Sequence, residues 1–147
     1  MSLKVLHLID SGGLYGAENM LLNLVEEQVK FGMDPLVLSA GDYGVPEKPL
    51  ETEARRRGLP IKEIRMRKGL SPLTTLKMLR DNRRKGIDIL HSHGYKFDIN
   101  LGLIPARMRG APVITTIHGH APAEPFSRMA IYQWLDKLMV KGFECVV

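Results

Sequence analysis

The sequence lacks the features that mark small secreted proteins, membrane-spanning proteins and disordered chains. It has a single cysteine, Cys145, which excludes a disulfide framework and fits a reducing compartment such as the cytosol. No apolar run is long enough to span a bilayer, and no signal peptide precedes the first apolar segment. Internal repeats and low-complexity tracts are also absent. These absences predict a globular protein of the cytoplasm.

Aromatic residues are also scarce, and this bears on the positive charge of the chain. The 147 residues carry a formal net charge of +5, and the excess lies in three basic blocks at residues 55–57, 65–68 and 80–85. Such blocks suit nucleic acid or an anionic membrane, or they are simply solvated helix faces. Aromatic residues make up 6% of the chain and none interleaves with the blocks, as stacking on single strands would require. We therefore expect no nucleic-acid partner, and peripheral contact with the inner face of an anionic membrane stays open.

Apolar runs alternate strictly with helical patterns along the whole chain. Strands are expected at residues 3–9, 36–40, 60–64, 87–91, 112–117 and 143–147, and helices at 17–31, 50–57, 72–85, 95–109 and 125–141. Pro105 should interrupt the fourth helix, and the last helix is expected to place Ile131, Trp134, Leu135, Leu138 and Met139 on its inner side. This order predicts one α/β domain over residues 1–147, with a doubly wound, mostly parallel sheet and helices on both faces, as in Rossmann-like folds.

A glycine-rich turn joins the first strand to the first helix. It reads D-S-G-G-L-Y-G-A-E from Asp10 to Glu18, and a glycine turn that opens a helix is typical of an anion site. Ser11, Gly13 and Gly16 have the G-x-G-x-x-G spacing, with serine in place of the first glycine, and no Lys-Ser or Lys-Thr pair follows. A tight turn without a ligand remains the alternative, with Glu18 as an acid that complements the helix dipole.

Two H-x-H pairs follow consecutive strands, His91-Ser-His93 and His118-Gly-His120. Alternate residues of an extended chain face the same side, so each pair is a candidate metal ligand set. No further cysteine or acidic cluster completes such a set, and we expect no metal. His91 is expected to be a hydrogen-bonded core residue of its strand and His7 a core residue of the first strand, whereas His93 and His118 should leave the sheet and face a substrate.

Three segments resemble motifs of family 4 (group 1) retaining glycosyltransferases. They are K-V-L-H-L-I-D-S-G-G-L-Y-G-A-E at residues 4–18, D-I-L-H-S-H-G at 88–94 and V-I-T-T-I-H-G at 113–119. The resemblance implies the N-terminal half of a GT-B enzyme, in which two Rossmann-like domains face each other across a cleft. In that family the N-terminal half mostly binds the acceptor, and the C-terminal half binds the nucleotide of the activated sugar.

The family resemblance also implies roles for particular residues. Gly12, Gly13 and Gly16 would form the loop against the donor diphosphate, and His118 would contact the donor sugar near the reacting carbon as the catalytic residue. His93 would line the acceptor side. The transfer would use a nucleotide-diphosphate sugar as co-substrate, with no metal and no other cofactor, and the acceptor would be a sugar or a lipid-linked molecule.

The chain departs from the family pattern in its length. The donor-binding domain, with its two glutamates seven residues apart, is not contained in these 147 residues. We therefore expect the isolated chain to fold but not to transfer sugar. Two other functions stay open at this point. One is an NAD-type or other nucleotide-binding Rossmann protein, with Asp42 as a candidate for the ribose acid, and the other is a basic module that docks on nucleic acid or anionic lipid.

Overall fold

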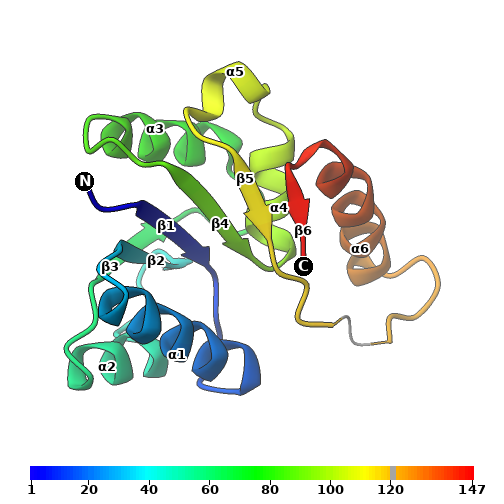
Figure 1. The fold of residues 1–147 in the computed structure, drawn as a ribbon. Helices are drawn as coiled ribbons and strands as arrows, with labels where there is room; N and C mark the ends of the chain where they lie inside the picture. Colours follow the sequence, from blue (N-terminus) through cyan, green and yellow to red (C-terminus); the bar gives the residue numbers. More distant parts are fainter. Residues whose placement is uncertain (120–121) are drawn as a thin grey trace.

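Six parallel strands form one sheet in the computed structural model, which describes residues 1–119 and 122–147 (Figure 1). The strands are β1 (Lys4–Ile9), β2 (Asp34–Asp42), β3 (Ile61–Met66), β4 (Ile89–His93), β5 (Val113–Thr115) and β6 (Cys145–Val146). Their order in the sheet is β3-β2-β1-β4-β5-β6, and every neighbouring pair is parallel. The predicted α/β, doubly wound, parallel architecture is confirmed.

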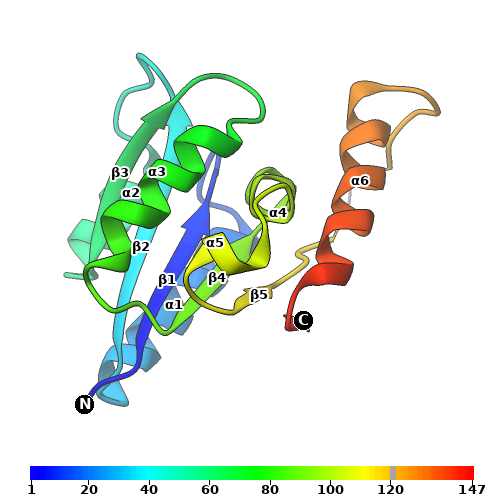
Figure 2. The same cartoon turned by 90° about the horizontal axis from the view of Figure 1, so that it is seen from above.

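Helices cover both faces of the sheet (Figures 1 and 2). They are α1 (Gly16–Lys30), α2 (Pro49–Arg56), α3 (Pro72–Arg83), α4 (Tyr95–Gly102), α5 (Ala106–Arg109) and α6 (Arg128–Met139), and a short 3-10 turn, η1 (Val140–Gly142), follows α6. α1 and α2 lie on one side, and α3 and α4 lie on the other, with α6 packed against α4. The break predicted at Pro105 is confirmed, because α4 ends at Gly102 and α5 begins at Ala106.

β1 is buried on both faces, which explains why its sequence is almost continuously apolar. Leu6 and Leu8 belong to the core that includes Phe97 and Leu101 of α4, whereas Ile9 belongs to the core under α1 and α2. Successive side chains of a strand point to opposite faces, so a strand between two helical layers needs apolar residues at odd and even positions alike. This double burial fixes β1 at the centre of the molecule.

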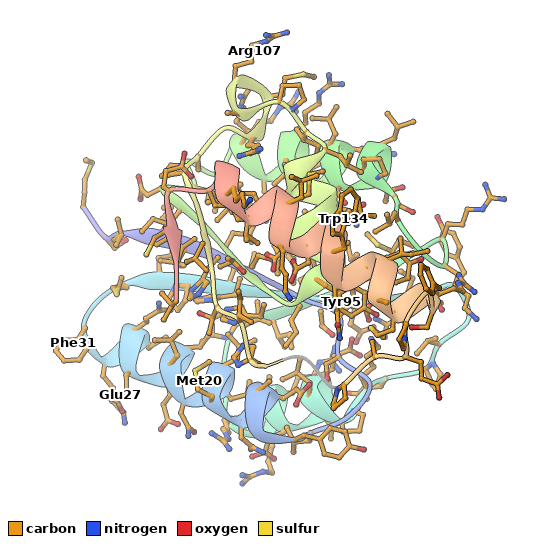
Figure 3. All side chains as sticks on the ribbon, turned by 90° about the vertical axis from the view of Figure 1, so that its right-hand side faces the viewer. Met20, Glu27, Phe31, Tyr95, Arg107 and Trp134 are labelled. Carbon is orange, nitrogen blue, oxygen red and sulfur yellow. The ribbon has the colours of Figure 1, made fainter. Side chains whose placement is uncertain are left out.

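The expected orientation of the last helix is wrong for three of its five residues, whereas Leu135 and Met139 are half-buried. Ile131, Trp134 and Leu138 of α6 are exposed, with 63% of Trp134 accessible, and Figure 3 looks onto the face of the molecule where Trp134 is labelled. The residue that α6 buries completely is an acid, Asp136. Met139 packs so closely on α4 that a Cβ atom placed on Gly102 would lie 2.4 Å from the Cβ of Met139. A contact through a glycine and a buried acid is not visible in an apolar periodicity.

β4 runs two residues further than the apolar pattern predicts. It pairs with β1 through His7 opposite His91 and Ile9 opposite His93, so His93 is the last residue of the strand and is not beyond it. The alternating apolar signal stops at Leu90, but backbone pairing with the longer β1 continues. As a result His93 is buried.

Arginines of two of the three basic blocks are paired with carboxylates of the chain itself. Arg56 and Arg57 both bond to Glu53, and Arg65 forms a two-pronged ion pair with Glu51 at 2.9 Å. Arg55 pairs with glutamates at positions 47 and 63. Charges neutralised in this way are weak attractors for a polyanion, which favours the interpretation of these blocks as a solvated surface. Among the described residues, no helix combines the length and the apolar character needed to cross a membrane.

Candidate functional site

The centre of the sheet contains a point where the winding direction reverses. β1 and β4 are neighbours, yet the helices that follow them, α1 and α4, lie on opposite faces of the sheet. In open α/β sheets this arrangement leaves a crevice at the carboxyl ends of the two strands, where ligands bind. The glycine-rich turn follows β1, Gly94 and Tyr95 follow β4, and His118 follows β5. The three segments singled out from the sequence therefore meet at one edge.

A buried carboxylate holds the glycine-rich turn in place. Glu18 lies in the first turn of α1 and accepts a hydrogen bond from the backbone N–H of Tyr15 at 2.8 Å. Its other oxygen accepts from the hydroxyl of Ser11 at 2.7 Å, and that hydroxyl in turn accepts from the N–H of Gly13 at 3.2 Å. The side chain of Glu18 therefore caps the helix and ties it to the turn. Serine in place of the first glycine supplies the group that Glu18 binds.

The three loop glycines differ in how much space surrounds them. None of Gly12, Gly13 and Gly16 has a positive φ. A Cβ on Gly13 would lie 2.4 Å from the ring of Tyr15, whereas nothing lies within 4 Å of a Cβ on Gly12 or Gly16. The backbone at Gly12 and Gly16 is therefore open to close approach by a ligand.

Asp10 and two lysines form a charged centre directly beside the turn. Asp10 accepts hydrogen bonds from Lys48 at 2.9 Å and from Lys96 at 2.6 Å. Burial alone would raise the pKa of Asp10, but the hydrogen bonds and charges of Lys96 and Lys48 hold it below its ordinary value. Lys96 also lies 3.8 Å from a carboxylate oxygen of Asp42, at the end of β2. Two lysines and two carboxylates thus meet where β1, β2 and β4 end.

Pockets open on both sides of Asp10. One, of about 280 Å³, lies towards α4 and α6 and is lined by Asp42, Tyr95, Lys96 and Arg128 as well as Asp10. The other, of about 380 Å³, lies between the turn and the loop before α2. A third, small pocket of about 50 Å³ brings His93 and Gly94 to the same aspartate. The crevice at the strand ends therefore contains three pockets, and their lining includes polar and positively charged side chains.

Sequence reasoning missed Lys48 and Lys96. Lys48 precedes α2 and Lys96 belongs to the first turn of α4, and they reach Asp10 over 38 and 86 positions in the chain. Each lysine reads as an ordinary surface charge in a polar segment. The two lysines meet at Asp10 because β2, β1 and β4 are neighbours in the sheet. The alternation of strands and helices in the sequence does not determine this order.

Four histidines lie in and beside the sheet at this edge. Three are joined in series: His7 Nδ1 lies 3.1 Å from His93 Nε2, and His93 Nδ1 lies 3.2 Å from His118 Nε2. The other nitrogen of His7 lies 2.8 Å from the side-chain oxygen of Gln28 on α1. His91 is separate and bonds to the hydroxyl of Thr116 at 2.8 Å, in agreement with its predicted place as a hydrogen-bonded strand residue.

The four rings are held in the neutral form near pH 7. Burial lowers the pKa of His7 and of His91 to about 4, and it lowers the pKa of His93 well below the ordinary value. His118 is exposed, yet partial desolvation still lowers its pKa, and the charge of Glu18 opposes that shift. Neutral imidazole has one donor and one acceptor nitrogen, so each ring can pass a hydrogen bond from one neighbour to the next.

The structure separates the predicted site histidines. His118 reaches the edge as expected, and His93 lies behind it with only a narrow opening to the small pocket. His120 lies outside the described residues. His7, expected to be a core residue, is fully buried, but its bond to His93 links it to the edge.

One group of the described residues has the composition of a metal site. The candidate ligand atoms of His7, His91 and His93 lie within 4.8 Å of one another. Three imidazoles suit zinc, which binds histidine nitrogen at about 2.0–2.1 Å. The facing nitrogens of His7 and His93 already share a hydrogen bond, so an ion would have to displace that hydrogen.

These features define a doubly wound α/β domain with a polar ligand crevice at its switch point, the class to which nucleotide-binding and sugar-transferring domains belong. The family model described as Glycosyltransferase Family 4 matches residues 15–147 of the chain. The chain belongs to Glycosyltransferase Family 4. A search of curated proteins finds no match.

Solved structures with the same fold are glycosyltransferases of about two and a half times this length. HepE (Alr3699) of Anabaena, in complex with UDP, has a TM-score of 0.70 at 16% identity, over 96% of this chain and 36% of that chain. A glycosyltransferase of Rickettsia africae has a TM-score of 0.63 at 17% identity, over 99% and 37%. MurG of Acinetobacter baumannii has a TM-score of 0.64 at 16% identity, over 98% and 40%. At these identities the likeness is one of fold, and the chain spans well under half of each structure.

Proposed function

We propose that this domain is the acceptor-side half of a retaining glycosyltransferase that takes its sugar from a nucleotide-diphosphate donor. The observation that carries the proposal is the meeting of the glycine-rich turn, the end of β4 and His118 at the switch point of a Family 4 domain. The presence of UDP in the complex with HepE supports a nucleotide sugar as donor. The acceptor, a sugar or a lipid-linked molecule, would enter the pockets beside Asp10.

Each part of the edge has a role in this proposal. The turn with Gly12, Gly13 and Gly16 faces the donor diphosphate, with the backbone of Gly12 and Gly16 open to it, and the N-terminus of α1 favours the negative charge of the diphosphate. His118 contacts the donor sugar near the reacting carbon, and His93 supports it from the acceptor side. No metal or cofactor takes part, because the charge of the leaving diphosphate is balanced by backbone N–H groups and by basic residues of a second domain.

A second domain must supply the remaining nucleotide contacts, so the isolated 147 residues bind donor weakly and do not transfer sugar. A thermal-shift series with UDP, GDP and NAD tests this, because a ligand of the native state raises the midpoint. Little response to each nucleotide is expected. A clear shift with NAD alone would replace the proposal by a nicotinamide-binding function, and sugar transfer by this chain alone would refute the need for a second domain.

Substitution of His118 tests its role in the complete enzyme. His118→Ala should lower kcat by about 100-fold while the Kd of the donor changes little, because the contact is made at the reacting centre. Lys62→Ala, on an exposed position of edge strand β3, is the control and should leave both constants unchanged. Unchanged turnover in His118→Ala would remove this residue from the site.

We place the enzyme in the cytoplasm, where nucleotide sugars are available as donors. Peripheral contact with the inner face of an anionic membrane would suit a lipid-linked acceptor. Sedimentation of the complete enzyme with phosphatidylglycerol vesicles, compared with phosphatidylcholine vesicles, tests that contact. Equal recovery in the two pellets would exclude it.

A further inference from the structure

The bonded histidines form one chain that begins on a helix and ends at the carboxyl edge of the sheet. Its links are Gln28 to His7 at 2.8 Å, His7 to His93 at 3.1 Å and His93 to His118 at 3.2 Å. Both ring nitrogens of His7 and of His93 are used in these links. The members come from α1, β1, β4 and the segment after β5, so the chain crosses the middle of the molecule.

The inner end of this chain sets the direction of every bond in it. The Gln28 amide turns its oxygen towards His7, and because this oxygen can only accept, His7 carries its hydrogen on Nε2. A neutral His7 then has a bare Nδ1, which accepts from Nε2–H of His93. By the same step, His93 Nδ1 accepts from Nε2–H of His118. The opposite arrangement would require the Gln28 amide to turn so that its nitrogen donates to His7 Nε2.

We propose that Gln28, acting through His7 and His93, locks His118 in the Nε2–H tautomer and so presents its Nδ1 as a hydrogen-bond acceptor at the crevice. A bare imidazole nitrogen at this place suits a hydroxyl donor, such as a hydroxyl group of a sugar. Gln28, His7 and His93 are then positioning residues. The tautomer is a property of the chain alone, whereas its use on a sugar rests on the function proposed above.

Burial makes the chain a lock and not a path for protons. A proton passed inward from His118 would place a positive charge on His93 or His7, which are 4% and 0% exposed. The amide of Gln28 cannot take the proton further. A charge is better solvated on exposed His118, where the carboxylate of Glu18 also favours it. A proton accepted at His118 therefore stays there.

Nuclear magnetic resonance of the ¹⁵N-labelled chain tests the lock directly. Long-range proton–nitrogen correlations at pH 7.5 report which ring nitrogen of each histidine carries hydrogen. In the wild type, His7, His93 and His118 should all carry hydrogen on Nε2. A wild-type His118 with hydrogen on Nδ1, or with both tautomers in comparable amounts, would overturn the proposal without any variant.

Two substitutions on α1 separate the lock from its surroundings. Gln28→Met keeps the length of the side chain but removes the acceptor, so the nitrogen shifts of His118 should move towards a mixture of tautomers. Val29→Met changes the next residue, which is exposed and takes no part in the chain, and should leave them unchanged. The shifts of His91 serve as an internal reference for intact packing. Unchanged His118 shifts in Gln28→Met would refute the role of Gln28.

Turnover in the complete enzyme tests the use of the lock. Gln28→Met should lower kcat by roughly tenfold with little change in the KM of the donor, as expected for one hydrogen bond of the transition state. Val29→Met should match the wild type. If the tautomer shifts but kcat does not, the lock stands and the proposed role of His118 falls, so the two failures can be told apart.

Discussion

Buried ionisable side chains determine how the stability of this domain depends on pH. His7, His91 and His93 are neutral because their rings are desolvated, and Asp98 and Asp136 are buried together between α4 and α6. Burial raises the pKa of Asp98 to about 7, and the nearby charge of Asp136 adds to the shift. The histidines and the aspartate have opposite effects in the same pH range.

The histidines predict a loss of stability on mild acidification. The pKa values of His7 and His91 are about 4 in the folded chain and about 6.5 when unfolded, so the unfolded state binds more protons between those values. These two histidines should therefore lower the free energy of unfolding by a few kcal/mol between pH 7 and pH 5, and the opposite contribution of Asp98 offsets part of this loss. Urea unfolding at four pH values measures this, and His91→Asn should show a shallower slope. A midpoint that rises on acidification would contradict the expectation.

Asp98 should destabilise the domain as the pH rises, and a comparison of Asp98→Asn with the wild type isolates this effect. A carboxyl group with a raised folded pKa contributes stability below its unfolded pKa of about 3.9, and this is lost as the pH rises through about 7. Asp98→Asn keeps the size and the contact with Ser92 and Thr115 but cannot ionise. Its stability relative to the wild type should increase from pH 4 to pH 7 and then level off. A difference that is the same at every pH would show that Asp98 does not titrate in this range.

The contact between Ser11 and Glu18 predicts coupling between two positions seven residues apart. Ser11→Ala leaves an oxygen of a buried carboxylate without its donor, so stability should fall by about 1–3 kcal/mol. In a chain that already carries Glu18→Gln, Ser11→Ala should lower the free energy of unfolding by less than it does in the wild type. Chemical unfolding of the four members of this cycle gives the coupling energy. Additive losses would mean that the two side chains act independently.

At the scale of elements, the sequence predicts the strands and helices well where one residue pattern decides them. Glycine and proline at the ends of helices, as at Pro72 and Pro105, place the boundaries within a few residues. The sequence patterns fail where contact with a neighbouring element determines the length or the orientation of a segment. β4 is longer than its apolar run because β1 pairs with it, and α6 turns its apolar side outward because it packs on α4 through Met139 and Asp136. The site shows the same limit, since Lys48, Lys96 and Gln28 act across long separations in sequence.

The glycine at the contact between α4 and α6 predicts a sharp steric effect. Gly102→Ala would place a methyl group 2.4 Å from the Cβ of Met139, so the two helices must separate, at a cost of about 1–3 kcal/mol. Gly142→Ala, where nothing lies within 4 Å of the added carbon, is the matched control. Thermal unfolding compares the two. Equal midpoints for the two variants would show that α6 is not held against α4.

At the scale of the whole molecule, the centre of the sheet is well paired and buried, whereas its β6 edge is short and exposed. β1 is paired on both sides and buried on both faces, whereas β6 is two exposed residues paired only with β5. Hydrogen exchange should follow this gradient, because local opening needs less energy where little surface is buried. Amides of β1 and β2 should exchange last, and the N–H of Val147, bonded to Thr115, among the first of the sheet. Equal protection of β6 and β1 would refute the gradient.

The exposed apolar side of α6 has a consequence for spectroscopy. The chain has a single tryptophan, Trp134, and it lies on that side (Figure 3). Its fluorescence therefore reports the solvent at α6 and not the interior, so the native emission should already be close to that of the unfolded chain. Unfolding has to be followed by circular dichroism. A blue shift in the folded protein would instead reveal that something has come to rest on α6.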